Sequence, residues 1–485
     1  MPGRCLALTK LSIIKGRPLK TEDAAVSLPT HPAPALSKAQ KIAWGMGAIT
    51  DHFMTNSVAN IADKIYTMGF GVNPSVLGWV MALPRLIDAF ADPLMGALSD
   101  NTRSRFGRRR PYIAAGALLS GLLFVLMWSP PAWLGQTGLA IFLLITAILY
   151  YLAYTVFTVP WSAFGLELTD DYHERTQVQA YRIFLAALGG IALGFMWKLA
   201  FYFGDGDDKQ GIHKTSLLFG IVIVVSGLIP LFCREKIRVQ QQPKIPVKQA
   251  FVQTFRNRPF VLLMTVVFLI LMGLFLVQRF GGYINVYYVF GGNKEAVSTL
   301  DIWSNLIFQT SGIVLIPVIS FLSRKLGKKN TMLLAEAAVG LAFLTSWVLY
   351  NPAVPYLQLI FFFLIAPGLS CVWMLSGSMI ADICDVDEQA TGLRREGAYG
   401  AAFSFMCKAS VSTTLIISGY LLNLCGYNAA AAMPSPESIY RLRIMYMVIP
   451  TCFFALAFGL TLLYPLSEKR IRAIRAELDQ RQRAE

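Results

Sequence analysis

The stretch "RLIDAFADPLMGALSDNTRSRFGRRRP" at residues 85–111 joins an apolar segment that carries two acids to a loop crowded with arginines. A bilayer core is about 30 Å thick and takes about 20 helical residues to cross. The apolar run that ends near Asn101 is long enough to do so. Arginines and lysines in short loops are retained on the cytoplasmic side of a membrane. The stretch therefore predicts a transmembrane helix that ends at the cytoplasmic face.

Composition places the whole chain in the same setting. Of its 485 residues, 55% are hydrophobic and only 15% are charged, whereas soluble domains are about 25% charged. Polar residues divide the chain into apolar runs that are each long enough to cross a membrane. These runs predict an all-α membrane protein with twelve transmembrane helices, at residues 42–71, 76–100, 112–130, 137–165, 178–203, 214–233, 259–289, 296–322, 330–350, 353–381, 397–424 and 443–464.

The lysines and arginines are unevenly distributed among the connections. The even-numbered connections are basic, at 103–110, 234–258 and 324–329, while the alternate connections carry few basic residues. Both termini are basic too, which predicts cytoplasmic termini in a multi-pass protein of the cell (inner) membrane, embedded in the lipid bilayer. The formal charge of +15 does not indicate a nucleic-acid partner. The basic clusters separate apolar segments and form no single basic face.

A polar stretch in the middle of the chain divides the twelve segments into six and six. An echo supports the division, since "SRFGRRR" at 104–110 follows the second segment and "SRKLGKK" at 323–329 follows the eighth. Parallel six-helix repeats with a substrate site between them are a known plan of secondary transporters. We expect such a protein to work as a monomer. The parts expected are a basic cytoplasmic tail (1–41), an N-terminal half (42–233), a cytoplasmic linker (234–258), a C-terminal half (259–464) and a C-terminal cytoplasmic tail (465–485).

Three ionisable residues of the second segment lie on one helical face, because Arg85, Asp88 and Asp92 are spaced three and four apart. An ionised group at membrane depth costs at least about 2.5 kcal/mol, so it should face a partner or a watery cavity. The two carboxylates are candidates to bind a proton or a sodium ion, and the alternative is a structural salt bridge. Lys408, within the eleventh segment, is their expected counter-charge. It would act either as a switch that ion binding releases or as a fixed structural pair.

Other polar residues within the segments are candidates to bind a substrate. Asp51 could bind hydroxyl groups. The planar donors of Arg182 could bind sugar oxygens or a carboxylate. Alternatively, Arg182 could serve only as a basic residue near the cytoplasmic end that sets the orientation of the helix. Trp161 and Trp373 could stack on a sugar ring or could serve as packing or interfacial residues. The cysteines and histidines are scattered, so we expect no metal and no cofactor. No nucleophile–base set or phosphate loop indicates an enzyme.

Three stretches together resemble the glycoside–pentoside–hexuronide:cation symporter family, the melibiose-permease-like branch of the major facilitator superfamily. They are "RLIDAFADPLMGALSDNTRSRFGRRRPYI" at 85–113, "VPWSAFGLELTDDYHERTQVQAYR" at 159–182 and "ADICDVDEQATGLRREGAYGAAFSFMCK" at 381–408. The resemblance implies cation-coupled transport of a sugar, glycoside or hexuronide by alternating access. The roles that it implies are cation binding for Asp88 and Asp92, sugar contact for Asp51 and Arg182, and a place near the cation for Lys408.

The resemblance also implies a cytoplasmic gate, in which ion pairs form and break as the two halves rock. Its members on the C-terminal half would be two acids and a short charged run, Asp382, Asp385, Arg394, Arg395 and Glu396. Arg103 and Arg105 are the expected partners from the other half.

The chain departs from the family pattern at two places near the expected cation site. The pattern has an aspartate two residues before the proline of the fourth helix, where this chain has Thr158, and a polar residue where it has Ala91. Fewer oxygen ligands favour a proton over sodium, which needs several. The phrase "RSRFGRRRP" is also similar to sucrose:proton symporters.

Two rival functions stand beside sugar transport. A lysolipid:cation symporter would use the same scaffold with a cavity that is apolar and open sideways to the bilayer. A non-transporting membrane sensor would need a signalling domain, and we expect none, because the terminal stretches 1–40 and 467–485 are too short.

Overall fold

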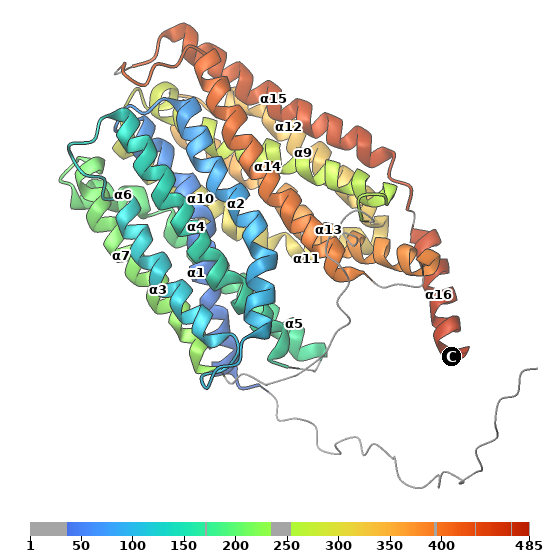
Figure 1. Cartoon of the computed structure of the whole chain (residues 1–485). Coiled ribbons are helices and arrows are strands. Elements are labelled where there is room, and N and C mark those ends of the chain that lie inside the picture. The colour runs from blue at the N-terminus through green and yellow to red at the C-terminus, as the bar shows by residue number, and fades with distance from the viewer. Residues whose placement is uncertain are drawn as a thin grey trace, which may run out of the picture. The chain divides into compact units, whose positions relative to one another are not determined.

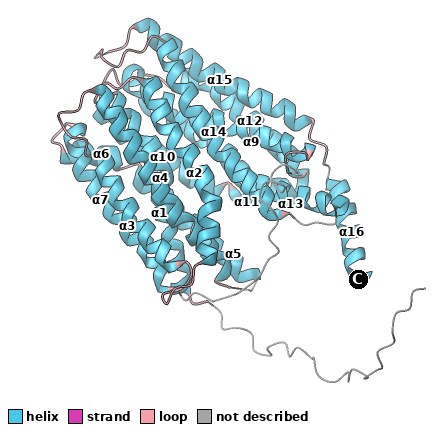
Figure 2. Cartoon of the chain, in the orientation of Figure 1, coloured by secondary structure: helices cyan, strands magenta, loops and turns pink. Residues whose placement is uncertain are grey.

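The computed structural model describes residues 36–169, 172–233, 254–391, 395–431, 433–466 and 468–484. Most of the expected linker at 234–258, most of the N-terminal tail and Arg394 lie outside the described residues. The described part of the chain consists of helices joined by loops and turns and contains no strand (Figure 2). The all-α prediction is therefore confirmed.

Each of the twelve predicted segments is helical. The first six form α1 (Lys38–Ala62) with the π-helix η1 (Asp63–Thr67), α2 (Pro74–Asn101), α3 (Arg110–Met127), α4 (Gln136–Glu167), α5 (Tyr172–Leu193) with α6 (Met196–Phe203), and α7 (Asp208–Leu228) with η2 (Ile229–Phe232). The last six form α9 (Arg258–Ile284) with the π-helix η3 (Asn285–Val289), α10 (Lys294–Val314) with α11 (Ile316–Leu326), α12 (Lys328–Leu349), η4 (Pro355–Gln358) with α13 (Leu359–Thr391), α14 (Glu396–Leu424) and α15 (Pro436–Leu462). A further helix, α16 (Glu468–Ala484), lies within the predicted C-terminal tail.

Several helices begin where a side chain satisfies their first backbone donors. Asn73 accepts a hydrogen bond from the Ser75 amide at 2.9 Å and is followed by Pro74, whose missing N–H costs nothing in a first turn. Asn257 caps α9 and Ser435 caps α15 in the same way, each again followed closely by a proline. These caps explain why the helices begin near the ends of the predicted apolar segments.

Within the described residues, nine helices are long and apolar enough to cross a membrane. The count is ten if α10 and α11, which meet at an angle of 41°, form one broken span. Helices α1 and α2 are absent from this set because they carry polar and charged side chains, among them Asp51, Arg85, Asp88 and Asp92.

The contacts of two helices, α2 and α10, set the position of the site. Helix α2 packs along α4 on one side and along α14 on the other, and α10 packs against α5 and α13 (Figure 1). Helices α1 and α9 lie next to this group, since α1 packs on α5 and α9 packs on α14. The first six segments thus meet the last six along α2, α5, α10 and α14, with the polar faces of α1 and α9 nearby.

Candidate functional site

A lysine and two aspartates meet where α2 contacts α14. Lys408 donates a hydrogen bond from Nζ to Asp92 Oδ2 at 2.6 Å, and the same nitrogen lies 2.8 Å from Asp88 Oδ2. Thr155 of α4 donates from Oγ1 to Asp88 Oδ1 and lies 3.2 Å from Asp92 Oδ1. These four residues are called the carboxylate–lysine cluster below. The structure therefore brings together Asp88, Asp92 and Lys408.

The two aspartates differ in their access to solvent. The Asp88 side chain is fully buried, whereas that of Asp92 is 24% exposed and that of Lys408 is 14% exposed. Removing one partner of a buried ion pair typically costs about 3–5 kcal/mol, because the remaining charge is left uncompensated. Of the two carboxylates, Asp92 is therefore the one that solvent reaches.

Arg85 lies on the same face of α2, but it has partners of its own. Its guanidinium donates to the backbone carbonyl of Thr55 and lies 4.3 Å from the ring centroid of Tyr151. The base that lies against the two carboxylates is thus Lys408 from the other side of the contact, not the local arginine.

Asp51 of α1 lies in a second polar group. Its Oδ1 accepts hydrogen bonds from Thr158 Oγ1 at 2.7 Å and from Tyr154 OH at 3.1 Å. Its Oδ2 lies 3.8 Å from Arg182 Nη2. Thr158, where the family pattern has an aspartate, thus donates a hydrogen bond to the carboxylate of Asp51.

The two tryptophans of interest have different surroundings. Trp161 is fully buried, and its ring stacks on Trp44 with centroids 5.1 Å apart. Each indole nitrogen of this pair donates to the other's backbone carbonyl, at 3.0 and 3.1 Å. The guanidinium of Arg182 lies 4.9 Å from the Trp161 ring centroid, so Trp161 positions Arg182. Trp373, by contrast, is 54% exposed and lines a cavity.

That cavity has a volume of about 400 Å³ and lies between α1, α9, α10 and α13. Amide and other polar side chains from both sets of six segments line it together with apolar ones, and the polar residues include His52, Asn56, Asn60, Lys64, Gln278, Asn285, Asp301, Asn305 and Gln309. His52 Nε2 lies 3.4 Å from Gln309 Nε2 across the cavity. A mostly apolar wall with a few convergent polar groups is typical of a small-molecule site. We call it the polar cavity.

The predicted gate residues lie at the end of the bundle where α2 ends and α12 begins, called the basic end below. Asp382 Oδ1 lies 3.0 Å from Arg475 Nη2, and Asp385 Oδ2 lies 2.7 Å from Arg475 Nε. Asp382 also pairs with Lys328 at 2.6 Å. Arg475 belongs to α16, so the C-terminal helix and α12 hold these two acids.

Arg395, in the charged run before α14, pairs with an acid of α13. Arg395 lies 2.5 Å from Asp387 Oδ1 and donates from Nε to Asp387 Oδ2 at 2.8 Å. The hydrogen bonds from Arg395 to Asp387 raise the pKa of Arg395 above its usual value. Glu396 is the first residue of α14.

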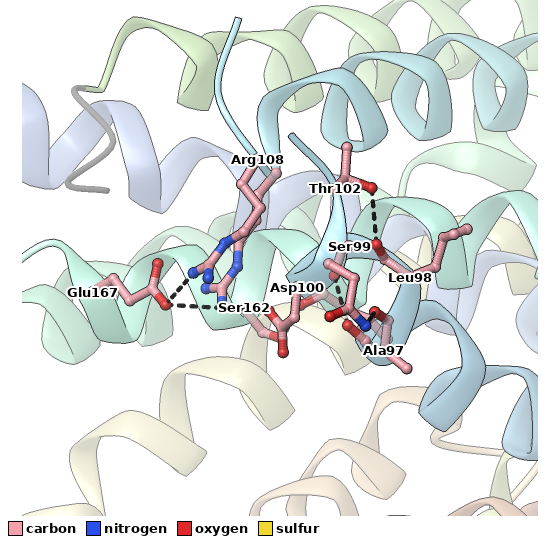
Figure 3. Close-up of polar contacts among 12 residues, drawn as sticks. Ala97, Leu98, Ser99, Asp100, Thr102, Arg108, Ser162 and Glu167 are labelled. Atoms are coloured by element: carbon pink, nitrogen blue, oxygen red, sulfur yellow. Dashed lines mark hydrogen bonds and ion pairs between the residues drawn. The ribbon is translucent and has the colours of Figure 1, made fainter. Parts of the chain in front are cut away.

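Arg103 and Arg105 are exposed in the loop between α2 and α3. Arg105 lies over the ring of Phe106, and among the described residues neither arginine forms an ion pair with Asp382 or Asp385. Their neighbour Arg108 instead binds Glu167 at 2.7 Å and fixes the loop against the end of α4 (Figure 3). The structure therefore does not bring the predicted gate partners together.

Sequence reasoning missed two sets of residues at this site. Thr155 carried only one signal, its place three residues before Thr158 on the same helical face. Lys64 and Asp301 lie near segment ends, where charged residues are common.

No group of three or more metal-ligating side chains occurs in the described part of the chain.

Comparisons with known proteins show the family of the chain. A family model described as MFS/sugar transport protein matches residues 43–468. The chain is 25% identical to a putative glycoside/cation symporter of Escherichia coli (strain K12), over 91% of this chain and 95% of the relative. It is 24% identical to the isoprimeverose transporter of Lactiplantibacillus pentosus, over 93% of this chain and 94% of the relative.

A solved structure shows the fold. The crystal structure of a D-xylose-proton symporter superimposes with a TM-score of 0.63 at 15% identity, covering 87% of this chain and 96% of that one. The family match confirms the resemblance carried by the three stretches and the prediction of a membrane transporter rather than an enzyme. The chain belongs to the family of MFS/sugar transport proteins.

Proposed function

We propose that this chain is a secondary active transporter that carries a sugar, a glycoside or a hexuronide together with a cation, by alternating access. The observation that carries the proposal is the carboxylate–lysine cluster, which joins α2 to α14. Helix α14 in turn packs on α9, one of the helices that line the polar cavity. The relatives named as a glycoside/cation symporter and an isoprimeverose transporter support the substrate class.

The coupling ion would act by replacing Lys408. A cation bound between Asp88 and Asp92 neutralises them, so that the ammonium group no longer has two charged partners. Because Lys408 belongs to α14 and both acids belong to α2, the tie between the two helices weakens when the ion binds. The ion thereby favours a different packing of the two halves, and by reciprocity the sugar raises the affinity for the ion by the same factor.

We favour a proton as the coupling ion over sodium. The cluster offers the oxygens of Asp88, Asp92 and Thr155, and Thr155 is already engaged as a donor to the carboxylates. A sodium ion needs several oxygen ligands, while a proton needs only one carboxylate. Thr158 is turned to Asp51 and adds no ligand to the cluster.

The polar cavity and Asp51 would form the substrate site. Asparagine and glutamine side chains both donate and accept hydrogen bonds, as sugar hydroxyls do. Asp51, Arg182 and Trp373 are the proposed sugar contacts, with Trp161 as a further candidate that stacks or positions Arg182. The amide side chains within the mostly apolar wall can hydrogen-bond sugar hydroxyls, whereas the acyl chain of a lysolipid has no group to bond with them.

The proposed topology has twelve spans in two halves, 42–233 and 259–464, with both termini in the cytoplasm of a cell whose inner membrane holds the protein. Helices α1 and α2 count as spans because their charged groups are paired inside the bundle, which reduces the cost of carrying them across lipid. The basic end would then face the cytoplasm. We propose that one chain suffices for transport.

Uptake into proteoliposomes tests the function. The purified protein is offered isoprimeverose, methyl β-D-xyloside, methyl β-D-glucuronide and a lysophospholipid, under an inward proton gradient or an inward sodium gradient. We expect accumulation of at least one of the three sugars driven by protons. Uptake of the lysophospholipid alone would favour the lipid symporter, and no uptake of any compound would contradict the proposal.

A further inference from the structure

Two neighbouring residues of the π-helix η1, Asp63 and Lys64, each form an ion pair with the last six segments. Both are buried, with exposed fractions of 5% and 7%. Asp63 Oδ2 lies 2.8 Å from Arg279 Nε of α9, and Lys64 pairs with Asp301 of α10. Both pairs lie at the end of the bundle opposite the basic end, where α1 and α9 finish, called the closed end below. Ion pairs thus join the two sets of helices there.

The pair between Asp63 and Arg279 is sealed by protein. Arg279 donates from Nη1 to the carbonyl of Leu415 at 2.6 Å and from Nη2 to the carbonyl of Pro74 at 3.1 Å. Tyr283 donates from its hydroxyl to Asp63 Oδ1 at 2.9 Å. These contacts tie η1, α2, α9 and α14 together. Neither residue of this pair lines the polar cavity.

The pair between Lys64 and Asp301 differs because both residues line the polar cavity. Its side chains retain exposed fractions of 8% and 17%, so a molecule in the cavity can reach them. Lys64 Nζ also lies 3.4 Å from Asn60 Oδ1 and 4.5 Å from the ring centroid of Trp197. A polyhydroxylated molecule has the donors and acceptors to replace the partners of both charges.

The π-helical turn explains how the adjacent residues Asp63 and Lys64 contact different parts of the protein. π-Helical turns are rare and often occur at functional sites. In η1 the turn directs Asp63 to Arg279 and Lys64 to the cavity. The other π-helix, η3, lies at the end of α9, the place in the last six segments that matches the end of α1, and its Asn285 also lines the cavity.

We propose that Lys64 and Asp301 form a substrate-facing latch. The pair holds the closed end shut while the cavity is empty, and hydroxyl groups of a bound substrate exchange with its two members so that this end opens. The substrate role rests on the proposed function, whereas the role in closing the end does not.

Crosslinking tests the latch without any substrate. Asn423 Nδ2 donates to Ser75 Oγ at 2.7 Å across the closed end, so Ser75→Cys with Asn423→Cys reports closure when the seven native cysteines are replaced by alanine. Lys64→Met and Asp301→Asn each leave one buried charge unpaired, and we expect each to slow crosslinking by at least about five-fold. The double variant K64M/D301N removes the latch without leaving an unpaired charge, and it should also crosslink more slowly than the parental protein.

A matched pair provides the control. Lys198 of α6 and Glu295 of α10 are 2.8 Å apart and also join the two sets of helices, but their side chains are 36% and 58% exposed. The K198M/E295Q variant should crosslink at the parental rate. Parental rates in both K64M and D301N would overturn the latch.

Transport tests the contact with substrate. The probe is whichever of isoprimeverose, methyl β-D-xyloside or methyl β-D-glucuronide the wild-type protein carries. We expect K64M and D301N to raise its KM about tenfold or more, with K198M/E295Q unchanged. An unchanged KM in both single variants would overturn the substrate contact. Failure of wild type to carry any of the three would instead contradict the proposed function, and crosslinking would still decide the latch.

Discussion

At the scale of single residues, the proposed coupling depends chiefly on the ammonium group of Lys408. Lys408 lies against two carboxylates, and Asp88 has no exposed surface through which water could replace that lysine. Two carboxylates that share a site cannot both ionise cheaply without such a base. Loss of the lysine should therefore leave the two carboxylates without the base that balances their charge.

The variant Lys408→Met tests this inference. We expect gradient-driven accumulation of sugar to fall at least about tenfold, since without the lysine the cluster has no charged group for the coupling ion to replace. Exchange of internal for external sugar, which needs no net ion movement, should persist. Counterflow and accumulation are measured side by side in proteoliposomes, with Lys198→Met as the control. Normal accumulation by Lys408→Met would exclude the proposed role.

Thr155 provides a second prediction at this scale. It donates a hydrogen bond to one acid and lies within hydrogen-bond distance of the other, and a hydrogen bond to a charged group contributes about 1.5–3 kcal/mol. Thr155→Val keeps the shape and removes the hydroxyl, so we expect the external proton concentration that half-saturates uptake to shift about tenfold or more. Thr155→Ser should behave as wild type. The pH dependence of uptake measures the shift, and equal profiles for the valine and serine variants would contradict it.

The charged members of the cluster could be identified in the sequence, because an ionised side chain within an apolar segment is rare. Asp88, Asp92 and Lys408 were predictable on that ground. Thr155 was not, because threonine is ordinary in membrane helices and its role depends on which face of α4 meets α2. Lys64 was missed for a different reason, since a lysine near a segment end resembles an interfacial charge.

At the scale of helices, the contact between α2 and α14 depends on close backbone approach. A Cβ atom at Gly78 would lie 2.5 Å from the carbonyl oxygen of Leu415, and one at Gly419 would lie 2.4 Å from that of Pro74. Small residues allow membrane helices to pack at such distances. The two glycines therefore permit closure of the end that holds the Lys64–Asp301 latch.

The substitution Gly419→Val should prevent this contact, because the obstructing atoms are backbone and cannot move aside. We expect crosslinking in the S75C/N423C background to fall at least about tenfold when Gly419→Val is added. Gly400→Val is the control, since Gly400 lies on the same helix and a Cβ atom there would meet no other atom within 4 Å. Equal crosslinking in the two variants would show that close packing at Gly419 is not needed for closure.

Helix positions were predictable from the apolar runs, but the partners of the basic-end residues were not. Asp382 and Asp385 were expected to face Arg103 and Arg105, and they pair with Arg475 and neighbouring α12 instead. Sequence does not reveal which conformation a transporter adopts. It also gave no reason to expect that α16, within a predicted tail, would supply a base to these acids.

At the scale of the whole molecule, the ion pairs described above join the two sets of helices at the closed end, whereas those of Arg108 and Arg475 at the basic end join groups of one set. Lys64 and Arg279 carry pairs across the closed end, while Arg108 and Arg475 bind acids of their own set at the basic end. This pattern is the one that alternating access requires of a protein open toward its basic end. Hydropathy alone does not identify every proposed span. Helix α2 carries the two acids of the cluster and α1 carries Asp51, and both helices are too polar to be counted among the apolar spans.

The central claim is that the carboxylate–lysine cluster couples ion movement to sugar movement. Accumulation of the transported sugar under an inward proton gradient tests it most directly, in proteoliposomes that contain wild type, Asp88→Asn or Asp92→Asn at equal amounts. Wild type should accumulate the sugar above the external concentration, and both variants should only equilibrate it. Accumulation to the wild-type level by both variants would contradict the account.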